Sequence, residues 1–222
     1  MHLKEIKNIF HKELDILYPK EEVDSFFAMM MEHYLGLERF ALALNPNLII
    51  TKDEEQPFFE GLAELRLERP IQYILGKANF MDMDFLVSED VLIPRPETEE
   101  LVRWILKDVQ GIRYEVQSKK YEIRNARLEG RNTRYEFKST KVKRESVNKE
   151  DRESEVQGSE LRILDIGTGS GCIAISLAKN LPNTKVYALD VSKKALEVAQ
   201  KNAIQNGVEV NFVEADILTI DA

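Results

Sequence analysis

The stretch that decides the fold is LRILDIGTGSGC, residues 161–172, in which an apolar run leads directly into three closely spaced glycines. A short apolar run bounded by glycines predicts a buried β-strand followed by a sharp turn. The next residues, IAISLAKNL (173–181), predict a helix. Strand, glycine turn and helix in this order are typical of the unit that opens a doubly wound α/β sheet.

The same pattern continues toward the end of the chain. KVYALD (185–190) predicts a second strand, SKKALEVAQKNAIQNG (192–207) a helix that stops at its Asn-Gly pair, and VEVNFVEAD (208–216) a third strand. Short links between alternating strands and helices favour parallel strands. We therefore expect an α/β fold in which residues 161–222 form the first half of a Rossmann-like, doubly wound sheet.

Residues 1–70 predict a small helical domain. Apolar residues recur at three- and four-residue steps in two segments, the first ending at Pro19 and the second near Gly36. A short helix is expected around residues 37–44. The sequence TKDE at residues 51–54 has the form of a capping box, which predicts the start of a further helix.

The segment between the helical domain and the sheet predicts first a β-hairpin and then a helix. Over residues 71–94 the apolar residues alternate, which predicts a β-hairpin with its turn near Ser88-Glu89-Asp90. Prolines and an acidic first turn then predict a linker helix over residues 95–110, because a helix dipole favours negative side chains at its start.

Residues 111–160 repeat every seven residues, as in RYEVQSK, KYEIRNA, RLEGRNT and RYEFKST. Their apolar residues lie two apart rather than three and four apart, which argues against a coiled coil. This composition, with its excess of basic residues, favours a low-complexity insert. A module that contacts protein or RNA, and an extended hairpin, remain alternatives.

Composition excludes several classes of protein. The 222 residues are 43% hydrophobic and 32% charged and carry a net charge of −8, which argues against a basic nucleic-acid-binding surface. No apolar run approaches the length of a membrane span. One cysteine, Cys172, and three histidines without ligand spacing argue against a metal site. We therefore expect a cytoplasmic protein that binds no metal, membrane or nucleic acid directly.

The glycine turn and two later carboxylates predict a nucleoside pocket. Glycines at 167, 169 and 171 let the backbone bend and let a ligand approach closely. Asp190 follows Gly169 by twenty-one residues, at the end of the second strand, where a carboxylate can accept hydrogen bonds from both ribose hydroxyls. Asp216 ends the third strand and can accept a hydrogen bond from an adenine amino group.

The residues around the glycines indicate which nucleoside binds. A dinucleotide fingerprint requires glycine at the position of Cys172, and Asp165 would repel a pyrophosphate. The same carboxylate suits a cation, which favours S-adenosylmethionine over NAD, since the former carries a sulfonium and an ammonium and no phosphate. Cys172 itself is expected to be a small residue that fits the turn rather than a nucleophile, because no histidine lies near it in sequence.

Two segments carry a resemblance to a known family. They are RPIQYILGKANFMDMDFLVSEDVLIPRPETEELV (Arg69–Val102) and the less specific ILDIGTGSGCIAISLA (Ile163–Ala178). Both resemble the peptide-chain release-factor glutamine N5-methyltransferases, which belong to the class I S-adenosylmethionine-dependent methyltransferases. The resemblance covers about residues 1–110 and 160–222, nearly everything outside the repeat.

The resemblance implies a domain organisation and a reaction. Residues 1–70 would dock the release factor, residues 71–94 would form a hinge, and the methyltransferase domain would transfer a methyl group to the glutamine side-chain nitrogen of the Gly-Gly-Gln loop. Gly167–Gly171 would hold the methionine part, Asp190 the ribose, and Asp216 with Ile217 the adenine. The expected cofactor-binding residues are thus Asp165, Gly167, Thr168, Gly169, Ser170, Gly171, Asp190, Asp216 and Ile217.

The chain departs from the family pattern in two places. The repeat stands where the family has a short link, which a surface connection tolerates at little entropic cost. The family's Asn-Pro-Pro-Tyr motif, which binds the glutamine amide, is expected about ten residues beyond Ala222. No catalytic residue is therefore assigned, and little activity is expected from what looks like an incomplete copy. Alternatives are a methyltransferase for another protein or an amine, and a non-catalytic protein that binds the cofactor or release factor.

Overall fold

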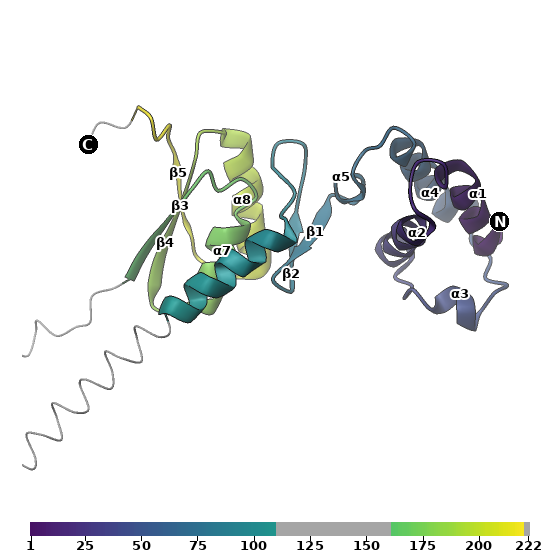
Figure 1. Cartoon of the computed structure of the whole chain (residues 1–222), viewed down its shortest axis with the longest axis horizontal. Helices are drawn as coiled ribbons and strands as arrows, with labels where there is room; N and C mark the ends of the chain where they lie inside the picture. Colours follow the sequence, from purple (N-terminus) through teal and green to yellow (C-terminus); the bar gives the residue numbers. More distant parts are fainter. Residues whose placement is uncertain (110–160, 220–222) are drawn as a thin grey trace, which may run out of the picture. The chain divides into compact units, whose positions relative to one another are not determined.

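A computed structural model describes residues 1–109 and 161–219 of the chain. The chain divides into two compact units, Met1–Pro94 and Arg95–Ala222 (Figure 1). The predicted repeat at residues 111–160 lies outside the described residues.

The first unit begins with helices, as predicted. Their bounds are α1 (Leu3–Leu14), α2 (Lys20–Leu35), α3 (Ala41–Leu44), α4 (Lys52–Leu65) and α5 (Ile71–Leu75). The predicted capping box is present at the start of α4, where the Glu54 N–H donates to Oγ1 of Thr51 at 3.3 Å and the Thr51 N–H donates to the Glu54 carboxylate at 2.8 Å. Helix α2 ends at Gly36 in the left-handed conformation that glycine favours.

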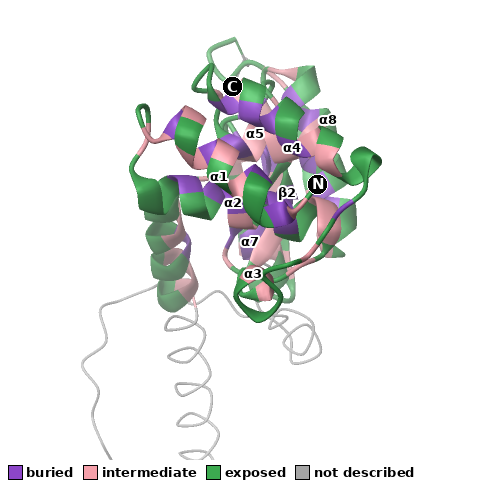
Figure 2. Ribbon diagram, turned by 90° about the vertical axis from the view of Figure 1, so that its right-hand side faces the viewer, coloured by how far each residue is buried: buried purple, intermediate pink, exposed green. Residues whose placement is uncertain are grey.

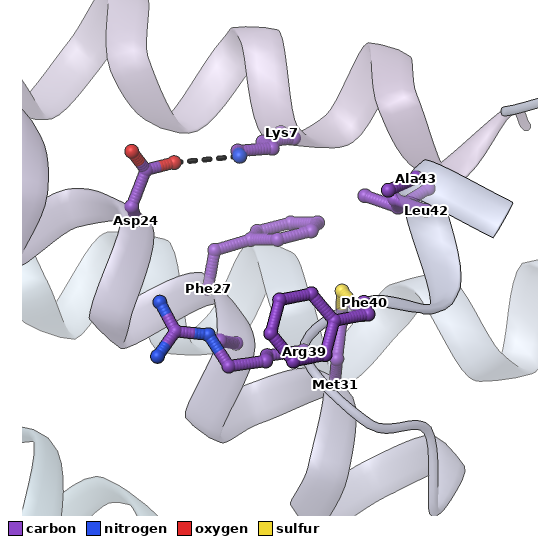
Figure 3. A pocket seen from close by; sticks show the side chains of 9 residues that line it. Lys7, Asp24, Phe27, Met31, Arg39, Phe40, Leu42 and Ala43 are labelled. Atoms are coloured by element: carbon purple, nitrogen blue, oxygen red, sulfur yellow. Dashed lines mark ion pairs between the residues drawn. The ribbon is translucent and has the colours of Figure 1, made fainter.

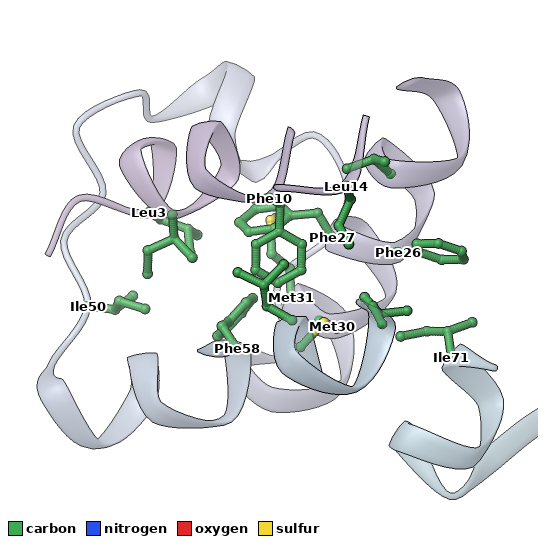
Figure 4. Packing of buried hydrophobic residues seen from close by; sticks show 14 residues of the cluster. Leu3, Phe10, Leu14, Phe26, Phe27, Met30, Met31, Ile50, Phe58 and Ile71 are labelled. Carbon is green, nitrogen blue, oxygen red and sulfur yellow. The ribbon is translucent and has the colours of Figure 1, made fainter. Parts of the chain in front are cut away.

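Large apolar side chains from α1, α2 and α4 form the core of this unit (Figure 4). The ring centroids of Phe10 and Phe27 lie 5.1 Å apart in an edge-to-face arrangement, and those of Phe27 and Phe58 lie 5.5 Å apart. Met30 and Met31 are buried among them, so the methionine pair belongs to the core. Buried and exposed residues share each of the helices α1, α2 and α4, as amphipathic packing requires (Figure 2).

The start of the chain is tied to the segment before α4. His2 pairs with Ile49 in an isolated antiparallel bridge. Beside it, the Leu3 N–H donates to the carbonyl of Leu48 at 2.9 Å. Residues nearly fifty positions apart therefore lie side by side at the edge of the helical core.

The β-hairpin is present, but its predicted turn was wrong. Strands β1 (Lys77–Phe80) and β2 (Met83–Leu86) pair antiparallel, so the chain reverses at Met81 and Asp82. Both turn residues have positive φ, 52° and 59°, which suits the twist of a two-residue hairpin turn. The Ser88–Asp90 segment forms a separate turn after β2, in which the Val91 N–H donates to the Ser88 carbonyl.

The segment that precedes the hairpin is helical rather than extended. Residues Ile71–Leu75 form α5, bounded by Pro70 and by Gly76 in the left-handed conformation. Ile71 is buried in the core of the helical unit. The prediction of a hairpin over residues 71–94 therefore holds only for residues 77–86, because residues 71–75 are helical and residues 87–94 form no strand.

The second unit contains a three-stranded parallel sheet, as predicted. Residues 96–109 are helical, as the acidic first turn indicated. The other elements are β3 (Leu161–Ile166), α7 (Cys172–Asn180), β4 (Thr184–Asp190), α8 (Lys193–Asn206) and β5 (Asn211–Glu214). The strand order is β3-β4-β5 with both pairs parallel, which confirms the α/β class and the opening half of a doubly wound sheet.

Small side chains allow the elements of this unit to lie close together. Ala174 of α7 and Val186 and Ala188 of β4 form a buried cluster. Helices α7 and α8 contact each other and both contact β4, so they cover one face of the sheet (Figure 1). The carboxyl ends of the three strands meet at one edge, where the predicted site residues lie.

Candidate functional site

Three glycines shape the loop between β3 and α7. Gly167, Gly169 and Gly171 all have positive φ, at 74°, 55° and 80°. A Cβ at either of the first two would meet no heavy atom within 4 Å, whereas a Cβ at Gly171 would lie 3.1 Å from the Cβ of Ala199 on α8. The first two glycines thus leave open space beside the loop, and the third allows α8 to approach it.

Asp190 lies against this loop, as its spacing predicted. One carboxylate oxygen accepts a hydrogen bond from the Gly169 N–H at 2.8 Å, and the other accepts one from the Ser192 N–H at 2.9 Å. Each carboxylate oxygen carries a second lone pair. The side chain can therefore hold the loop and still accept hydrogen bonds from a ligand.

Asp165 is the last but one residue of β3 and lies partly buried at the start of the loop. Burial raises the pKa of its carboxyl above the ordinary value, and the nearby Asp190 charge also raises it. Hydrogen bonds from the Thr168 hydroxyl, at 2.7 Å, and from the Ala174 N–H oppose this rise in pKa. Asp165 therefore binds the loop to the first turn of α7, a role that sequence reasoning missed.

Asp216 and Ile217 follow β5 on the exposed edge of the sheet. The Asp216 carboxylate accepts a hydrogen bond from the Leu218 N–H at 2.9 Å. The Ala215 N–H donates to the carbonyl of Asp190 at 3.1 Å, which ties the end of β5 to the end of β4. The structure therefore brings Asp216 to the strand end next to that of Asp190, with its side chain open to solvent.

Thr168 and Ser170 are buried, at 6% and 2% exposure, so they offer a ligand mainly their backbone. Behind the loop, the side-chain amide of Asn202 donates to the Ser170 carbonyl at 2.9 Å. Sequence reasoning missed Asn202. The signal that could have found it is a polar residue among the apolar positions Ala199 and Ala203 of the helix.

Cys172 begins α7 and is buried. Burial raises the pKa of its thiol, which disfavours the thiolate that a nucleophile needs. Among residues 1–109 and 161–219, no group of three His, Cys, Asp or Glu side chains could hold a metal ion. None of the helices described there is long and apolar enough to cross a membrane.

Two hollows lie away from the glycine loop. The first, of 270 Å³, is in the helical unit, with the Lys7–Asp24 ion pair at 2.6 Å and the Arg39 guanidinium over the Phe40 ring among its lining groups (Figure 3). The second, of 440 Å³, is lined by α8 and the start of β5. Neither includes a predicted site residue.

Comparison with known proteins identifies two family models in the chain. Residues 13–76 match a model described as a PrmC N-terminal domain, and residues 157–222 match one described as a methyltransferase domain. Among solved structures, a tRNA (uracil-54, C5)-methyltransferase from Pyrococcus abyssi is 20% identical and matches 63% of this chain and 23% of that one. Its TM-score of 0.34 is too low to characterise the fold.

Curated relatives match almost the whole chain. The release factor glutamine methyltransferase of Flavobacterium psychrophilum is 39% identical over 98% of this chain and 61% of the relative. That of Bacteroides thetaiotaomicron is 32% identical over 99% of this chain and 62% of the relative. The chain thus spans about three fifths of the length of these relatives. These matches agree with the resemblance carried by the sequence motifs: over nearly its whole length, the chain is similar to the release factor glutamine methyltransferases.

Proposed function

We propose that this chain carries the cofactor-binding part of an S-adenosylmethionine-dependent methyltransferase that acts on the glutamine of peptide-chain release factors. The observation that carries the proposal is the hydrogen bond between Asp190 and the Gly169 N–H. It places a carboxylate with spare lone pairs beside a loop whose glycines at 167 and 169 face open space. The names of the relatives that match the chain support the substrate.

The residues present fit S-adenosylmethionine better than a dinucleotide. In dinucleotide-binding folds the free N–H groups at the start of the first helix hold a pyrophosphate. Here the Asp165 carboxylate accepts a hydrogen bond from the Ala174 N–H in that turn, so the helix start already faces a negative group. Asp165 and Asp190 together favour a cation at this end of the sheet. When bound, S-adenosylmethionine supplies an electrophilic methyl group on a sulfonium.

Each site residue has a proposed part in holding the cofactor. The backbone of residues 167–171 would contact the methionine part, with Thr168 and Ser170 acting through their peptide groups because their side chains are buried. Asp190 would accept hydrogen bonds from the ribose hydroxyls. Asp216 would accept one from the adenine amino group, with Ile217, which is 47% exposed, packing against the base.

The proposed acceptor is the side-chain amide of the glutamine in a Gly-Gly-Gln loop. The nitrogen would take the methyl group from the sulfonium of the bound cofactor as the carbon–sulfur bond broke, and its proton would pass to water. An amide nitrogen is a poor nucleophile, so the rate depends on holding it in line with the methyl group. We propose that the helical domain, residues 1–70, docks the release factor for this purpose, with the hairpin region, residues 71–94, as a hinge.

Titration calorimetry tests the cofactor class. S-adenosylhomocysteine should bind the chain, and NAD should not bind measurably. Tighter binding of NAD would overturn the cofactor assignment. The comparison uses one protein preparation, so differences in folding cannot explain the result.

A methyl-transfer assay with labelled S-adenosylmethionine tests the acceptor. The substrates are a release factor and the same factor with its Gly-Gly-Gln glutamine replaced by alanine. Label only in the unaltered factor supports the proposed reaction, and equal label in both points to another acceptor. Cofactor binding without transfer to either factor agrees both with a chain that carries only the cofactor-binding part and with a non-catalytic binding protein.

A further inference from the structure

A buried asparagine on α8 lies behind the glycine loop. Asn202 has no exposed surface, and its side-chain amide donates to the carbonyl of Ser170 at 2.9 Å. The two residues are thirty-two positions apart, so this hydrogen bond joins α8 to the loop before α7. We propose that Asn202 is a positioning residue of the cofactor site, which fixes the loop without touching the cofactor.

Because the Asn202 amide is buried, its hydrogen bond contributes to the stability of the folded chain. A polar side chain moved from water into an apolar environment costs free energy unless it is hydrogen-bonded. The neighbouring buried positions on the same helix, Ala195, Ala199 and Ala203, are apolar. An apolar side chain at position 202 would therefore meet the packing requirement of this face. What the asparagine adds is a side-chain N–H group that donates to the carbonyl of Ser170.

Two hydrogen bonds restrain the peptide group that joins Ser170 to Gly171. The carbonyl of Ser170 accepts from Asn202, and the N–H of the same peptide group, which belongs to Gly171, donates to the Thr168 carbonyl at 2.9 Å. With both ends hydrogen-bonded, this peptide group cannot rotate without breaking a bond. The left-handed φ of 80° at Gly171, directly before α7, is thereby kept.

Asp190 restrains the same loop from the other side. Its carboxylate accepts from the Gly169 N–H, one residue before the carbonyl that Asn202 holds. The contact between Gly171 and Ala199 brings α8 close enough for Asn202 to reach the loop. The backbone of residues 169–171 is thus held between a carboxylate on β4 and an amide on α8, and the open space beside Gly169 keeps a constant shape for a ligand.

The inference rests on the proposed function, since it assigns a role toward the cofactor. The first variant is Asn202→Asp, which keeps the shape of the side chain and replaces its donor by an acceptor. We expect the affinity for S-adenosylhomocysteine to fall by about tenfold or more, as expected for loss of a buried hydrogen bond. The matched control is Asn206→Asp, one turn further along α8, because its amide donates to the Asn202 backbone carbonyl.

A second variant and a second measurement keep the test decisive. Asn202→Ser removes the amide without adding charge, and its hydroxyl is too short to reach the loop. In ¹⁵N-labelled protein without ligand, the amide resonances of Gly169 and Gly171 should move or broaden in this variant, while that of Gly36 in the helical unit stays in place. A merely structural loss of stability would not move these two resonances selectively.

The outcomes separate this inference from the proposed function. Unchanged loop resonances in Asn202→Ser, or equal losses of affinity in Asn202→Asp and Asn206→Asp, would overturn the positioning role. Failure of the unaltered chain to bind S-adenosylhomocysteine would overturn the proposed cofactor, and the ligand-free resonances would still decide the role of Asn202 in the loop.

Discussion

The helical unit and the sheet unit keep their structure in different ways. In the helical unit, bulky rings such as Phe10, Phe27 and Phe58 fill the core. In the sheet unit, small residues allow close approach, and single hydrogen bonds from Asp190 and Asn202 fix the loop. Substitutions should therefore affect the stability of the first unit through lost volume, and the site of the second through lost directional bonds.

The largest expected effect is the loss of a buried ring from the helical unit. Phe58 and Phe59 are neighbours on α4, but Phe58 has no exposed surface and Phe59 is 37% exposed. Phe58→Ala should lower the free energy of unfolding by about 3–5 kcal/mol, because it removes buried area and leaves a cavity. Phe59→Ala should cost about 1 kcal/mol. Chemical denaturation measures both, and similar losses would show that the ring core does not dominate this unit.

The next effect is steric and concerns the close approach at the third glycine. In Gly171→Ala, the new methyl group would lie 2.9 Å from Cδ1 of Ile175 and 3.1 Å from the Cβ of Ala199, in a left-handed backbone conformation. Strain and crowding together should lower the free energy of unfolding by about 2–4 kcal/mol. Gly167→Ala is the control, since its φ is also positive but its Cβ would meet nothing within 4 Å. If both variants lose the same stability, the contact with α8 is unimportant.

A smaller effect is expected from the carboxylate that holds the front of the loop. Asp190→Ala should weaken the binding of S-adenosylhomocysteine by about 1.5–3 kcal/mol, the range for hydrogen bonds to a charged group. Asp216→Ala should weaken it less, because that side chain is open to solvent. Titration calorimetry with S-adenosylhomocysteine shows which of the two variants loses more affinity. Unchanged affinity in Asp190→Ala would contradict the ribose assignment.

The smallest effect is a pH dependence of stability. The pKa of Asp165 is raised in the folded chain by burial, above its ordinary value of 3.8. Below that value the carboxyl is protonated in both states. As the pH rises from there through the raised pKa, the unfolded chain loses the proton first, so the free energy of unfolding falls. The difference in stability between the unaltered chain and Asp165→Asn should therefore decrease over this range. A difference independent of pH would contradict the raised pKa.

Sequence reasoning worked where glycine and alternation mark the elements. The run before Gly167 corresponds residue for residue to β3, and Asn206-Gly207 ends α8 as predicted. The prediction that this strand is buried was wrong, because Leu164 and Ile166 are each 52% exposed on the face opposite the helices. It failed at the hairpin turn, because Met81 and Asp82 adopt positive φ without the Asn-Gly or Asp-Gly pair that usually announces it. It also failed at α5, a helix of five residues, which is too short for an apolar period to be visible.

The sequence predicted the part of the candidate site that depends on spacing along the chain, and missed the part that depends on tertiary contacts. Asp190 and Gly169 were brought together by a spacing that follows from the strand–helix–strand unit, and the structure places them in contact. The contribution of Asn202 depends on which carbonyl a side chain on α8 reaches. The hydrogen bonds of Asp165 likewise depend on tertiary geometry that no spacing encodes. Partners of this kind can be found only from coordinates.

The pairing of His2 with Ile49 has a consequence for synthesis of the protein. Because residues at the very start of the chain contact residues nearly fifty positions later, the edge of the helical core cannot close until about that length has left the ribosome. Helix α4, which supplies Phe58 to the core, follows directly. Until then α1 can pack against α2, but the part of its apolar stripe that contacts Phe58 stays uncovered. During this period a chaperone that binds exposed apolar segments would find that part accessible.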